Sequence, residues 1–303
     1  MITLGVDIGG TNIRIGAITP DGVIAHSESH RQKEVIVPED AVSSLTVHLQ
    51  DYISRNYAQE EVIGIGIGLP GTLSKDQSTV LSMPNVKGFD GINLRDTLGQ
   101  AMGISVFPLK DVSALFYHDR QKLNLDDEDI VVGYYVGTGL GNVIYLNGQI
   151  LTGQNGSAGE LGHIPINDFD GLCGCGNAGC AEAFCGGLYL AKLQAEHFPE
   201  TPMGELFAEH SNHPLIQEYV ERLSLPIASE INILDPGTLL LGGGVINMPR
   251  FPFEQLEKAI RRHARKPFPE QALKVIQVRS EGEPGVIGAG LYAWDMIERK
   301  VSQ

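Results

Sequence analysis

The sequence predicts an α/β fold built from two domains. Strand and helix patterns alternate along the chain, which is typical of α/β proteins. A strand–turn–strand pattern with a glycine-rich turn opens the chain over residues 2–18 and returns over residues 130–148. The length of 303 residues suits about two domains of roughly 150 residues each. We therefore expect two halves that share an architecture, although their sequences show no repeat.

Apolar periodicity and turn residues place the individual elements. In the first half they predict two strands within residues 2–18, helices over 38–58, 93–102 and 111–123, and a buried strand over 62–69 whose alternating glycines allow close packing. In the second half they predict the strand pair of 130–148, helices over 181–197 and 214–234, a strand over 238–241 and a closing helix over 285–300. We expect the 214–234 helix to bend or break near Pro226.

Composition and charge exclude several classes of protein. Hydrophobic residues make up 42% of the chain and charged residues 19%, which is typical of a globular protein. The net charge of −15 disfavours binding to nucleic acid or to anionic lipid. No apolar run approaches the roughly 20 residues that span a bilayer, and residues 1–7 lack the basic start of a signal peptide. We therefore expect a cytoplasmic protein with no nucleic-acid or membrane partner.

Two glycine-rich turns are candidate phosphate sites. They comprise Gly9–Gly10–Thr11 and Gly137–Thr138–Gly139–Leu140–Gly141. Such turns aim several backbone N–H groups and a hydroxyl at one point and can hold phosphate, although two ordinary hairpin turns are the alternative. Asp7 precedes the first turn and could hold Mg²⁺, or else accept hydrogen bonds from turn amides. The pair of turns together with Asp7 favours a polyphosphate site.

The familiar nucleotide motifs are missing or incomplete. The chain has no G-x-x-x-x-G-K-[ST] motif, which excludes a P-loop enzyme. Residues 66–71 match G-x-G-x-x-G, but no helical pattern follows Gly71, as a dinucleotide-binding motif requires. Gly242–Gly243–Gly244 follows an apolar strand. A flat ring such as adenine could lie on that bare backbone, and a plain strand-to-helix loop explains the stretch equally well.

One histidine and three cysteines lie close together in the sequence. They are His163, Cys173, Cys175 and Cys180, and a Cys₃His set suits tetrahedral Zn²⁺ with no open position, hence a structural metal. Free thiols in a glycine-rich loop are the alternative. Cys185 falls on the following helix and is expected in the core.

Two glutamates flank this cluster. Carboxylates such as Glu160 and Glu182 can hydrogen-bond several hydroxyls of a polyol, and a metal would fix their positions. Solvated surface charges are the alternative for both residues.

Several segments together resemble the ROK family of sugar kinases, within the actin–hexokinase–Hsp70 ATPase superfamily. They occur in the family's order over nearly the whole chain: residues 7–14, 68–71, 110–113, 137–141, 160–163, 173–180 and 241–244. The Cys-x-Cys-Gly-x-x-Gly-Cys run beside Glu160–Leu161–Gly162–His163 is the most specific of them. The glycine turns are signals of the superfamily only.

The resemblance implies a two-domain actin/hexokinase-like, ribonuclease H-like α/β fold with ATP and Mg²⁺ in an inter-domain cleft. We expect an N-terminal domain over residues 1–115, a larger domain over 116–290, and a last segment, 291–303, that returns to the first domain. The resemblance implies that Mg²⁺ is held by Asp7 and that the phosphates are bound by Gly9, Gly10, Thr11, Asn12, Gly137, Thr138, Gly139 and Gly141. It implies that the nucleoside lies on Gly242, Gly243 and Gly244, and that the sugar is bound by Gly71, Asn85, Asp111, Glu160, His163 and Glu182. The implied ligands of Zn²⁺ are His163, Cys173, Cys175 and Cys180.

Asp111 is the expected catalytic base. The residues alone slightly favour a helix cap, whereas the resemblance implies that this carboxylate takes the proton of the sugar hydroxyl. Lys110 and Ser113 replace the two asparagines of the family's usual Asn-Asp-x-Asn, which argues against common glucokinase specificity. Residues 160–166 and 231–249 look most like the D-allose kinase branch of the family.

We therefore expect an ATP-dependent hexose kinase that phosphorylates the 6-hydroxyl, with D-allose first and N-acetylmannosamine, glucose and fructose as alternatives. The resemblance also implies a homodimer. Another candidate is a ROK transcriptional repressor, which carries a helix-turn-helix ahead of the first phosphate turn. Because Asp7 lies so near the start, we expect no such segment. A sugar-binding protein without catalysis is the remaining alternative.

Overall fold

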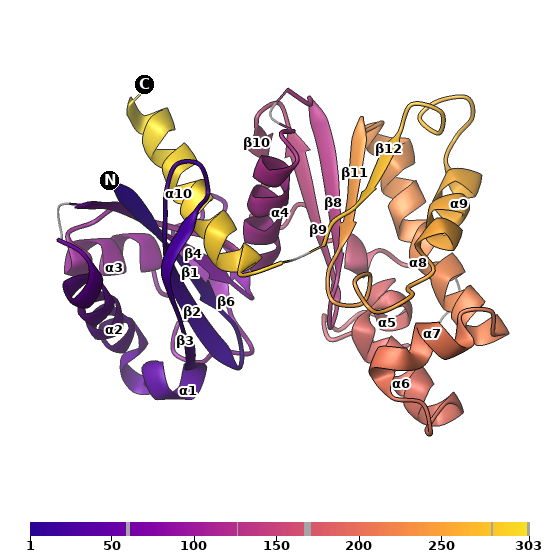
Figure 1. Ribbon diagram of the computed structural model, residues 1–303, viewed down its shortest axis with the longest axis horizontal. Helices are drawn as coiled ribbons and strands as arrows, with labels where there is room; N and C mark the ends of the chain where they lie inside the picture. The colour runs from indigo at the N-terminus through magenta and orange to yellow at the C-terminus, as the bar shows by residue number, and fades with distance from the viewer. Residues whose placement is uncertain (59–60, 126, 167–170, 280, 302–303) are drawn as a thin grey trace. The chain divides into compact units, whose positions relative to one another are not determined.

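The computed structural model describes residues 1–58, 61–125, 127–166, 171–279 and 281–301 of the chain (Figure 1). The chain forms two compact units. Unit 1 comprises Met1–Asp126, Thr152–Ala158 and Glu281–Gln303, and unit 2 comprises Asp127–Leu151 and Gly159–Ser280. The chain therefore leaves unit 1 and returns to it at its end, while the domain limits predicted from the sequence stay predictions.

A five-stranded mixed sheet forms the centre of unit 1. Its order is β3-β2-β1-β4-β7, with β1 at Ile2–Ile8, β2 at Asn12–Ile18, β3 at Ile24–Arg31, β4 at Val62–Leu69 and β7 at Val106–Lys110. The first three strands pair antiparallel, and β1, β4 and β7 run parallel. A separate two-stranded sheet joins β5 (Thr72–Leu73) to β6 (Val80–Ser82). Because β5 is a strand, no helix follows Gly71, as the sequence predicted.

Helices cover both faces of this sheet. They are α1 (Gln32–Val35), α2 (Ala41–Asn56), α3 (Leu94–Met102), α4 (Asp111–Lys122) and α10 (Pro284–Val301). Leu4, Val6 and Ile8 of β1 belong to the core that contains residues of α2 and α3. Side chains alternate along a strand, so Thr3, Gly5 and Asp7 face the other side, where Thr3 Oγ1 donates to the Gly290 carbonyl of α10 at 2.8 Å.

Glycines allow α10 to lie directly on the sheet. A Cβ at Gly5 would be 1.8 Å from the Val286 carbonyl oxygen, and one at Gly66 of β4 would be 1.8 Å from the Ala289 carbonyl oxygen. A Cβ at Gly288 of α10 would be 1.7 Å from the carbonyl oxygen of Ala114 in α4. The close packing expected of the glycine-rich strand is therefore confirmed, and α10 is its partner.

Unit 2 repeats the strand arrangement of unit 1. Its sheet has the order β10-β9-β8-β11-β12, with β8 at Ile130–Val136, β9 at Leu140–Leu146, β10 at Gln149–Ile150, β11 at Thr238–Gly242 and β12 at Lys274–Gln277. Its helices are α5 (Glu182–Cys185), α6 (Gly187–His197), α7 (Leu206–His210), α8 (Pro214–Leu234) and α9 (Phe253–His263). As in unit 1, two antiparallel pairings adjoin two parallel ones. The shared architecture of the two halves, expected from the sequence, is confirmed.

Two helix predictions need correction. Helix α8 continues through Pro226 from Pro214 to Leu234, so the helix is not broken there, and the expected bend stays a prediction. Pro226 is buried, and the hydroxyl of Tyr134 donates to its carbonyl at 3.4 Å. The helix predicted over 181–197 is divided at Gly186, which has an extended backbone between α5 and α6.

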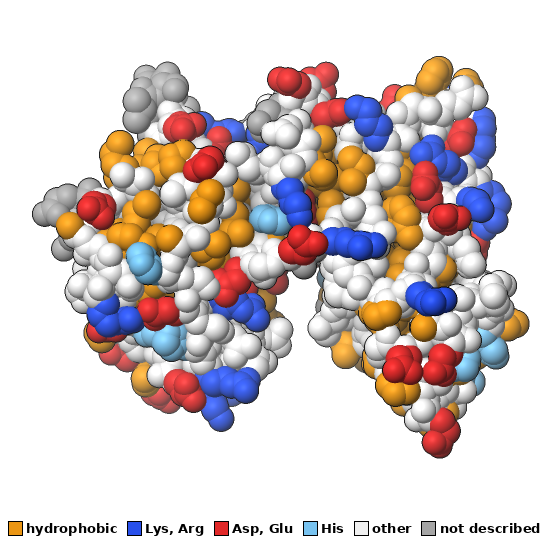
Figure 2. Space-filling model, in the orientation of Figure 1, with side chains coloured by type: hydrophobic (Ala, Val, Ile, Leu, Met, Phe, Trp, Pro, Cys, Tyr) orange, Lys and Arg blue, Asp and Glu red, His pale blue; other side chains and the backbone are white. Residues whose placement is uncertain are grey.

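The described surface agrees with the composition. Figure 2 shows acidic and basic side chains interspersed over the face that it draws, rather than one continuous basic area. Among the described residues, every helix is too short or too polar to span a bilayer.

Candidate functional site

The first glycine turn joins β1 to β2 in unit 1. The N–H of Gly9 donates to the Asn12 carbonyl at 2.8 Å, and the N–H of Gln32 donates to the Thr11 carbonyl at 2.9 Å. Gly10 and Thr11 are exposed. A Cβ at Gly10 would be 3.3 Å from the Asn85 Cβ, so the structure brings a predicted sugar residue next to a predicted phosphate turn.

Asp7 is the last residue but one of β1, and its carboxyl group lies at the start of α10. A Cβ at Gly285 would be 2.9 Å from the carboxyl carbon of Asp7, so the helix begins against this carboxyl group. Asp7 Oδ2 accepts a hydrogen bond from Arg14 Nη1 at 3.2 Å. Desolvation raises the pKa of Asp7 above its usual value, Arg14 lowers it, and the nearby charge of Glu283 raises it. Glu283 Oε2 is buried without a partner among the described residues.

Asp111 is the first residue of α4 and follows β7 directly. Lys110 occupies the N-cap position without a side-chain cap bond, and Asp111 Oδ1 accepts the N–H of Val112 at 2.7 Å. The residue is exposed, yet desolvation by the protein around its carboxyl group raises its pKa to about 6. The negative charge of Asp7 raises this pKa further, whereas Lys110 lowers it. Asp7 and Asp111 thus interact electrostatically.

Gly71, the remaining predicted sugar-site residue of unit 1, lies where the structure has no room for a side chain. Gly71 follows β4, and a Cβ there would be 2.4 Å from the Ser82 carbonyl oxygen of β6. Ser113, which departs from the family pattern beside Asp111, is buried in α4.

The second glycine turn joins β8 to β9 in unit 2. The N–H of Gly137 donates to the Gly139 carbonyl at 3.1 Å, which closes the turn. The N–H of Leu140 donates to Glu182 Oε2 at 2.8 Å. Glu182 was predicted as a sugar residue, and in the structure one of its carboxylate oxygens is engaged by the predicted phosphate turn. Sequence reasoning missed this pairing, since the two residues are far apart in the chain.

At Gly242, which ends β11, and at Gly243 and Gly244 after it, the space available for a side chain differs from one position to the next. A Cβ at Gly242 would be 2.5 Å from Val278 Cγ2, and one at Gly243, whose φ is +91°, would be 2.6 Å from the backbone of Val136. A Cβ at Gly244 would meet no atom within 4 Å. Val278, directly after β12, and Val136 of β8 therefore account for the first two glycines, and Gly244 is the one with open space beside it.

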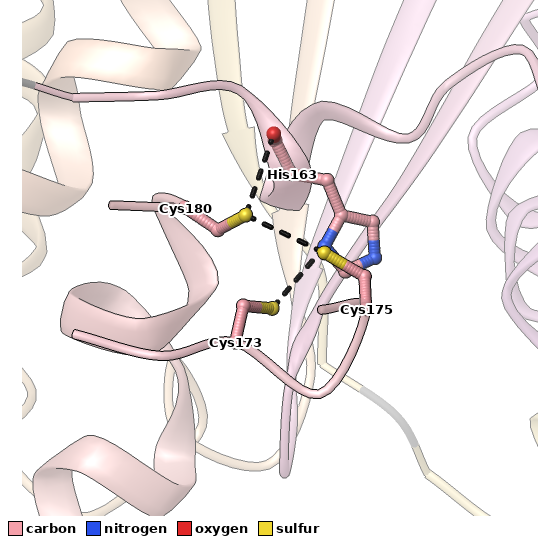
Figure 3. Close-up of side chains that lie close together, drawn as sticks. All are labelled: His163, Cys173, Cys175 and Cys180. Atoms are coloured by element: carbon pink, nitrogen blue, oxygen red, sulfur yellow. Dashed lines mark hydrogen bonds between the residues drawn. The ribbon is translucent and has the colours of Figure 1, made fainter. Parts of the chain in front are cut away.

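The predicted Cys₃His set is brought together in unit 2 (Figure 3). One possible ligand atom from each of His163, Cys173, Cys175 and Cys180 lies within 4.8 Å of all the others. His163 Nδ1 lies 3.5 Å from Cys173 Sγ, and Cys175 Sγ lies 3.6 Å from Cys180 Sγ. Three thiols and an imidazole are the donor set of a closed tetrahedral zinc site. Cys185 is fully buried in α5, as predicted.

Glu160 lies on the other side of the same histidine. Its Oε2 is 3.6 Å from His163 Nε2, while Nδ1 of that ring faces Cys173. Metal-bound histidines commonly direct their second ring nitrogen to a carboxylate, which fixes the tautomer. The arrangement therefore fits a metal-binding histidine oriented by Glu160.

Comparison with known proteins decides the family. A family model described as "ROK family" matches residues 3–295. The chain belongs to the ROK family. The chain is 28% identical to an N-acetyl-D-glucosamine kinase of Vibrio parahaemolyticus, covering 94% of this chain and 97% of that protein. It is 25% identical to a glucokinase of Thermotoga maritima, covering 85% of this chain and 86% of that protein.

Solved ROK structures have the same fold. A ROK hexokinase from Thermus thermophilus superposes with a TM-score of 0.80 at 26% identity, over 99% of this chain and 100% of that chain. The expected α/β fold of the actin/hexokinase-like kind is therefore confirmed. A ROK family transcriptional regulator also superposes with a TM-score of 0.80 at 26% identity, covering 96% of this chain and 77% of that chain. Membership of the ROK family thus spans more than one function.

Proposed function

We propose that this protein is an ATP-dependent sugar kinase that transfers the γ-phosphoryl group to the 6-hydroxyl of a hexose. The observation that carries the proposal is the carboxyl group of Asp111, which is exposed and has a pKa of about 6. A base with that pKa is ionised near neutral pH and is still a competent proton acceptor. The kinase relatives that match nearly the whole chain support the same reaction.

Asp111 takes the proton of the attacking hydroxyl in this proposal. Its Oδ1 is held by the Val112 N–H, which fixes the carboxyl group at the start of α4. Phosphoryl transfer depends on positioning and on charge neutralisation more than on covalent chemistry. Gly71, Asn85, Glu160 and His163 complete the proposed sugar-binding set. Glu182, which the sequence also places there, is engaged by the N–H of Leu140.

The two glycine turns bind the phosphates in this proposal, through backbone N–H groups other than those of Gly9 and Gly137, which donate to carbonyls within their own turns. The proposed residues are Gly9, Gly10, Thr11, Asn12, Gly137, Thr138, Gly139 and Gly141, with Gly242, Gly243 and Gly244 on the nucleoside. The carboxyl of Asp7 and the orphaned buried oxygen of Glu283 beside it fit a hard divalent cation such as Mg²⁺. When bound, that ion neutralises phosphate charge.

Zinc is the proposed ion at the Cys₃His cluster. Its four protein donors leave no open position, so its function is to hold the loop that carries the glutamates beside it. The resemblance to the family also supports a homodimer, which light scattering of the purified protein would test.

D-Allose is the first proposed substrate. Residues 160–166 and 231–249 support it, and Lys110 and Ser113 in place of the usual asparagines argue against common glucokinase specificity. The curated relatives act on other hexoses, so N-acetylglucosamine and glucose belong in the same panel. N-Acetylmannosamine and fructose complete it.

The test is coupled ADP release with each sugar of the panel, using ATP and Mg²⁺. The expected result is sugar-dependent turnover with the highest kcat/KM for D-allose. Turnover with a different best sugar would reject the substrate and keep the kinase. An absence of turnover with every sugar would reject the kinase.

A sugar sensor without catalysis is the second candidate, favoured by the similarity to a ROK transcriptional regulator. Isothermal titration separates the two functions. A sensor binds sugar without releasing ADP when ATP is added, whereas a kinase consumes the nucleotide.

A further inference from the structure

The carboxylate of Glu182 is built into the second glycine turn. Glu182 is the first residue of α5 and lies two positions after Cys180. Its Oε2 accepts the N–H of Leu140 at 2.8 Å. A Cβ at Gly139 would be 2.2 Å from the same oxygen. The missing side chain at Gly139 therefore makes room for Glu182, and Glu182 ties one side of the turn to the Cys/His loop.

The start of α6 holds the other side of the turn. The N–H of Gly187 donates to the Gly137 carbonyl at 2.9 Å, and the N–H of Leu188 donates to the Thr138 carbonyl at 3.0 Å. A Cβ at Gly187 would be 2.3 Å from the Gly137 carbonyl oxygen. Residues 182–188 thus hold three backbone groups of the turn, one through a side chain and two through the backbone.

These bonds orient the two N–H groups in the middle of the turn. In a planar trans peptide the C=O of one residue and the N–H of the next point in opposite directions. Because the carbonyls of Gly137 and Thr138 are directed to α6, the N–H groups of Thr138 and Gly139 point away from it. Within the described residues, neither the N–H of Thr138 nor that of Gly139 donates a hydrogen bond. Two nearby amides aimed to one side make an anion-binding turn.

We propose that Glu182 is a positioning residue for the nucleotide: it fixes the turn of residues 137–140, so that the N–H groups of Thr138 and Gly139 face a phosphate. The inference rests on the proposed function in one respect, namely that this turn binds ATP. A positioning role for Glu182 can be told from a sugar contact by the effect of removing the side chain, because its loss weakens ATP binding more than sugar binding. The adjacent Cys/His cluster holds Glu182 in place.

Steady-state kinetics separate the two roles. Glu182→Ala should raise the KM for ATP about tenfold, the loss expected for a hydrogen bond to a charged group, with less than about a twofold change in the KM for sugar. Glu182→Gln keeps a carbonyl that can accept the Leu140 N–H and should restore most of the ATP affinity. The matched control is Glu196→Ala on the exposed side of α6, where Glu196 pairs only with Lys192 in the described structure.

Hydrogen exchange gives a readout that does not need activity. Without ligands, the peptide that contains residues 137–141 should exchange faster in Glu182→Ala than in the wild type or in Glu196→Ala. Unchanged exchange, or a rise in the KM for sugar with the KM for ATP unchanged, would overturn the inference and leave Glu182 as a sugar contact.

A second pair of variants tests the contact itself. Gly139→Ala places a methyl group where the carboxylate of Glu182 lies, so the carboxylate must leave the Leu140 N–H and Tm should fall measurably in the wild type. In the Glu182→Ala background the obstruction is gone, and the same change should cost less than half as much. Equal losses in both backgrounds would contradict the contact.

The proposed function and this inference fail in different ways. A wild-type protein that phosphorylates no sugar refutes the kinase, while hydrogen exchange and the Gly139→Ala pair still decide whether Glu182 fixes the turn. An active wild type whose Glu182→Ala variant keeps its KM for ATP and its exchange pattern refutes only the inference.

Discussion

Glu230 of α8 accepts a hydrogen bond from Asn142 Nδ2 of β9 at 3.0 Å inside the core of unit 2. Glu230 is only 3% exposed. Burial raises the pKa of Glu230 from 4.5 to about 7, although its hydrogen bonds to Asn142 and Tyr134 lower it. Asn142 Oδ1 is buried without a partner among the described residues. Burial therefore favours the neutral, protonated form of the Glu230 carboxyl group.

The stability of the protein should fall as pH rises from about 4.5 to about 7 because of this residue. In that window the folded state holds a proton that the unfolded state has released, so the free energy of unfolding decreases with pH. A rise in pKa from 4.5 to about 7 corresponds to about 3 kcal/mol. Glu230→Gln keeps an acceptor and adds a donor, so its stability should be flatter across this window and higher above it. Urea unfolding at several pH values measures this, and parallel curves for both proteins would contradict it.

Asp111→Asn should reduce kcat by about 10²- to 10⁴-fold, the usual contribution of a general base. In the wild type, kcat/KM should fall below a pH of about 6, because the raised pKa of Asp111 means that the base becomes protonated there. Asp21→Asn is the matched control, since Asp21 is an exposed carboxylate of the same unit that bonds only to Thr19 in the described structure. Turnover retained in Asp111→Asn, with unchanged thermal melting, would reject the assigned base.

Purified protein should contain about one zinc ion per chain, because the four donors form a single closed set. Cys180→Ser should lose most of the metal, whereas Cys185→Ala, which changes a core thiol outside the cluster, should keep it. Elemental analysis measures both. Removal of the metal with a chelator should also speed hydrogen exchange at residues 137–141, because Glu182 follows Cys180 closely. A metal-free wild type purified without chelator would contradict the assignment.

Gly66→Ala should destabilise unit 1 by about 1–3 kcal/mol or more, since the new methyl group would meet the Ala289 carbonyl of α10. Gly204→Ala is the control, because a Cβ there meets nothing within 4 Å. Denaturant unfolding of the two variants compares them directly. Similar stability of Gly66→Ala and the wild type would mean that α10 does not lie on β4 as described.

Features that depend on neighbouring residues in the chain were predictable. The hairpins around the two glycine turns and the buried strand at Val62–Leu69 follow from local periodicity and turn residues. The Cys₃His cluster was predictable for the same reason, because its ligands lie in one short stretch. Leu256, Ala259 and Ile260, the buried residues of α9, likewise follow a helical spacing.

Other elements carry weak local signals. Strand β3 is polar along most of its length, and β7 contains Pro108, which usually argues against a strand. Both lie at the edges of their sheet, where a polar or proline-containing strand is tolerated because one side makes no ladder hydrogen bonds.

The sequence alone determined the alternation of strands and helices, the two glycine turns and the residues available to a metal. Tertiary structure decided which distant groups meet: Glu182 with Leu140, Gly66 with Ala289, and Gly243 with Val136. It also decided the raised pKa values of Asp111 and Glu230. The physical reason is that propensity and periodicity act over a few residues, whereas close approach and desolvation depend on atoms that only folding brings together.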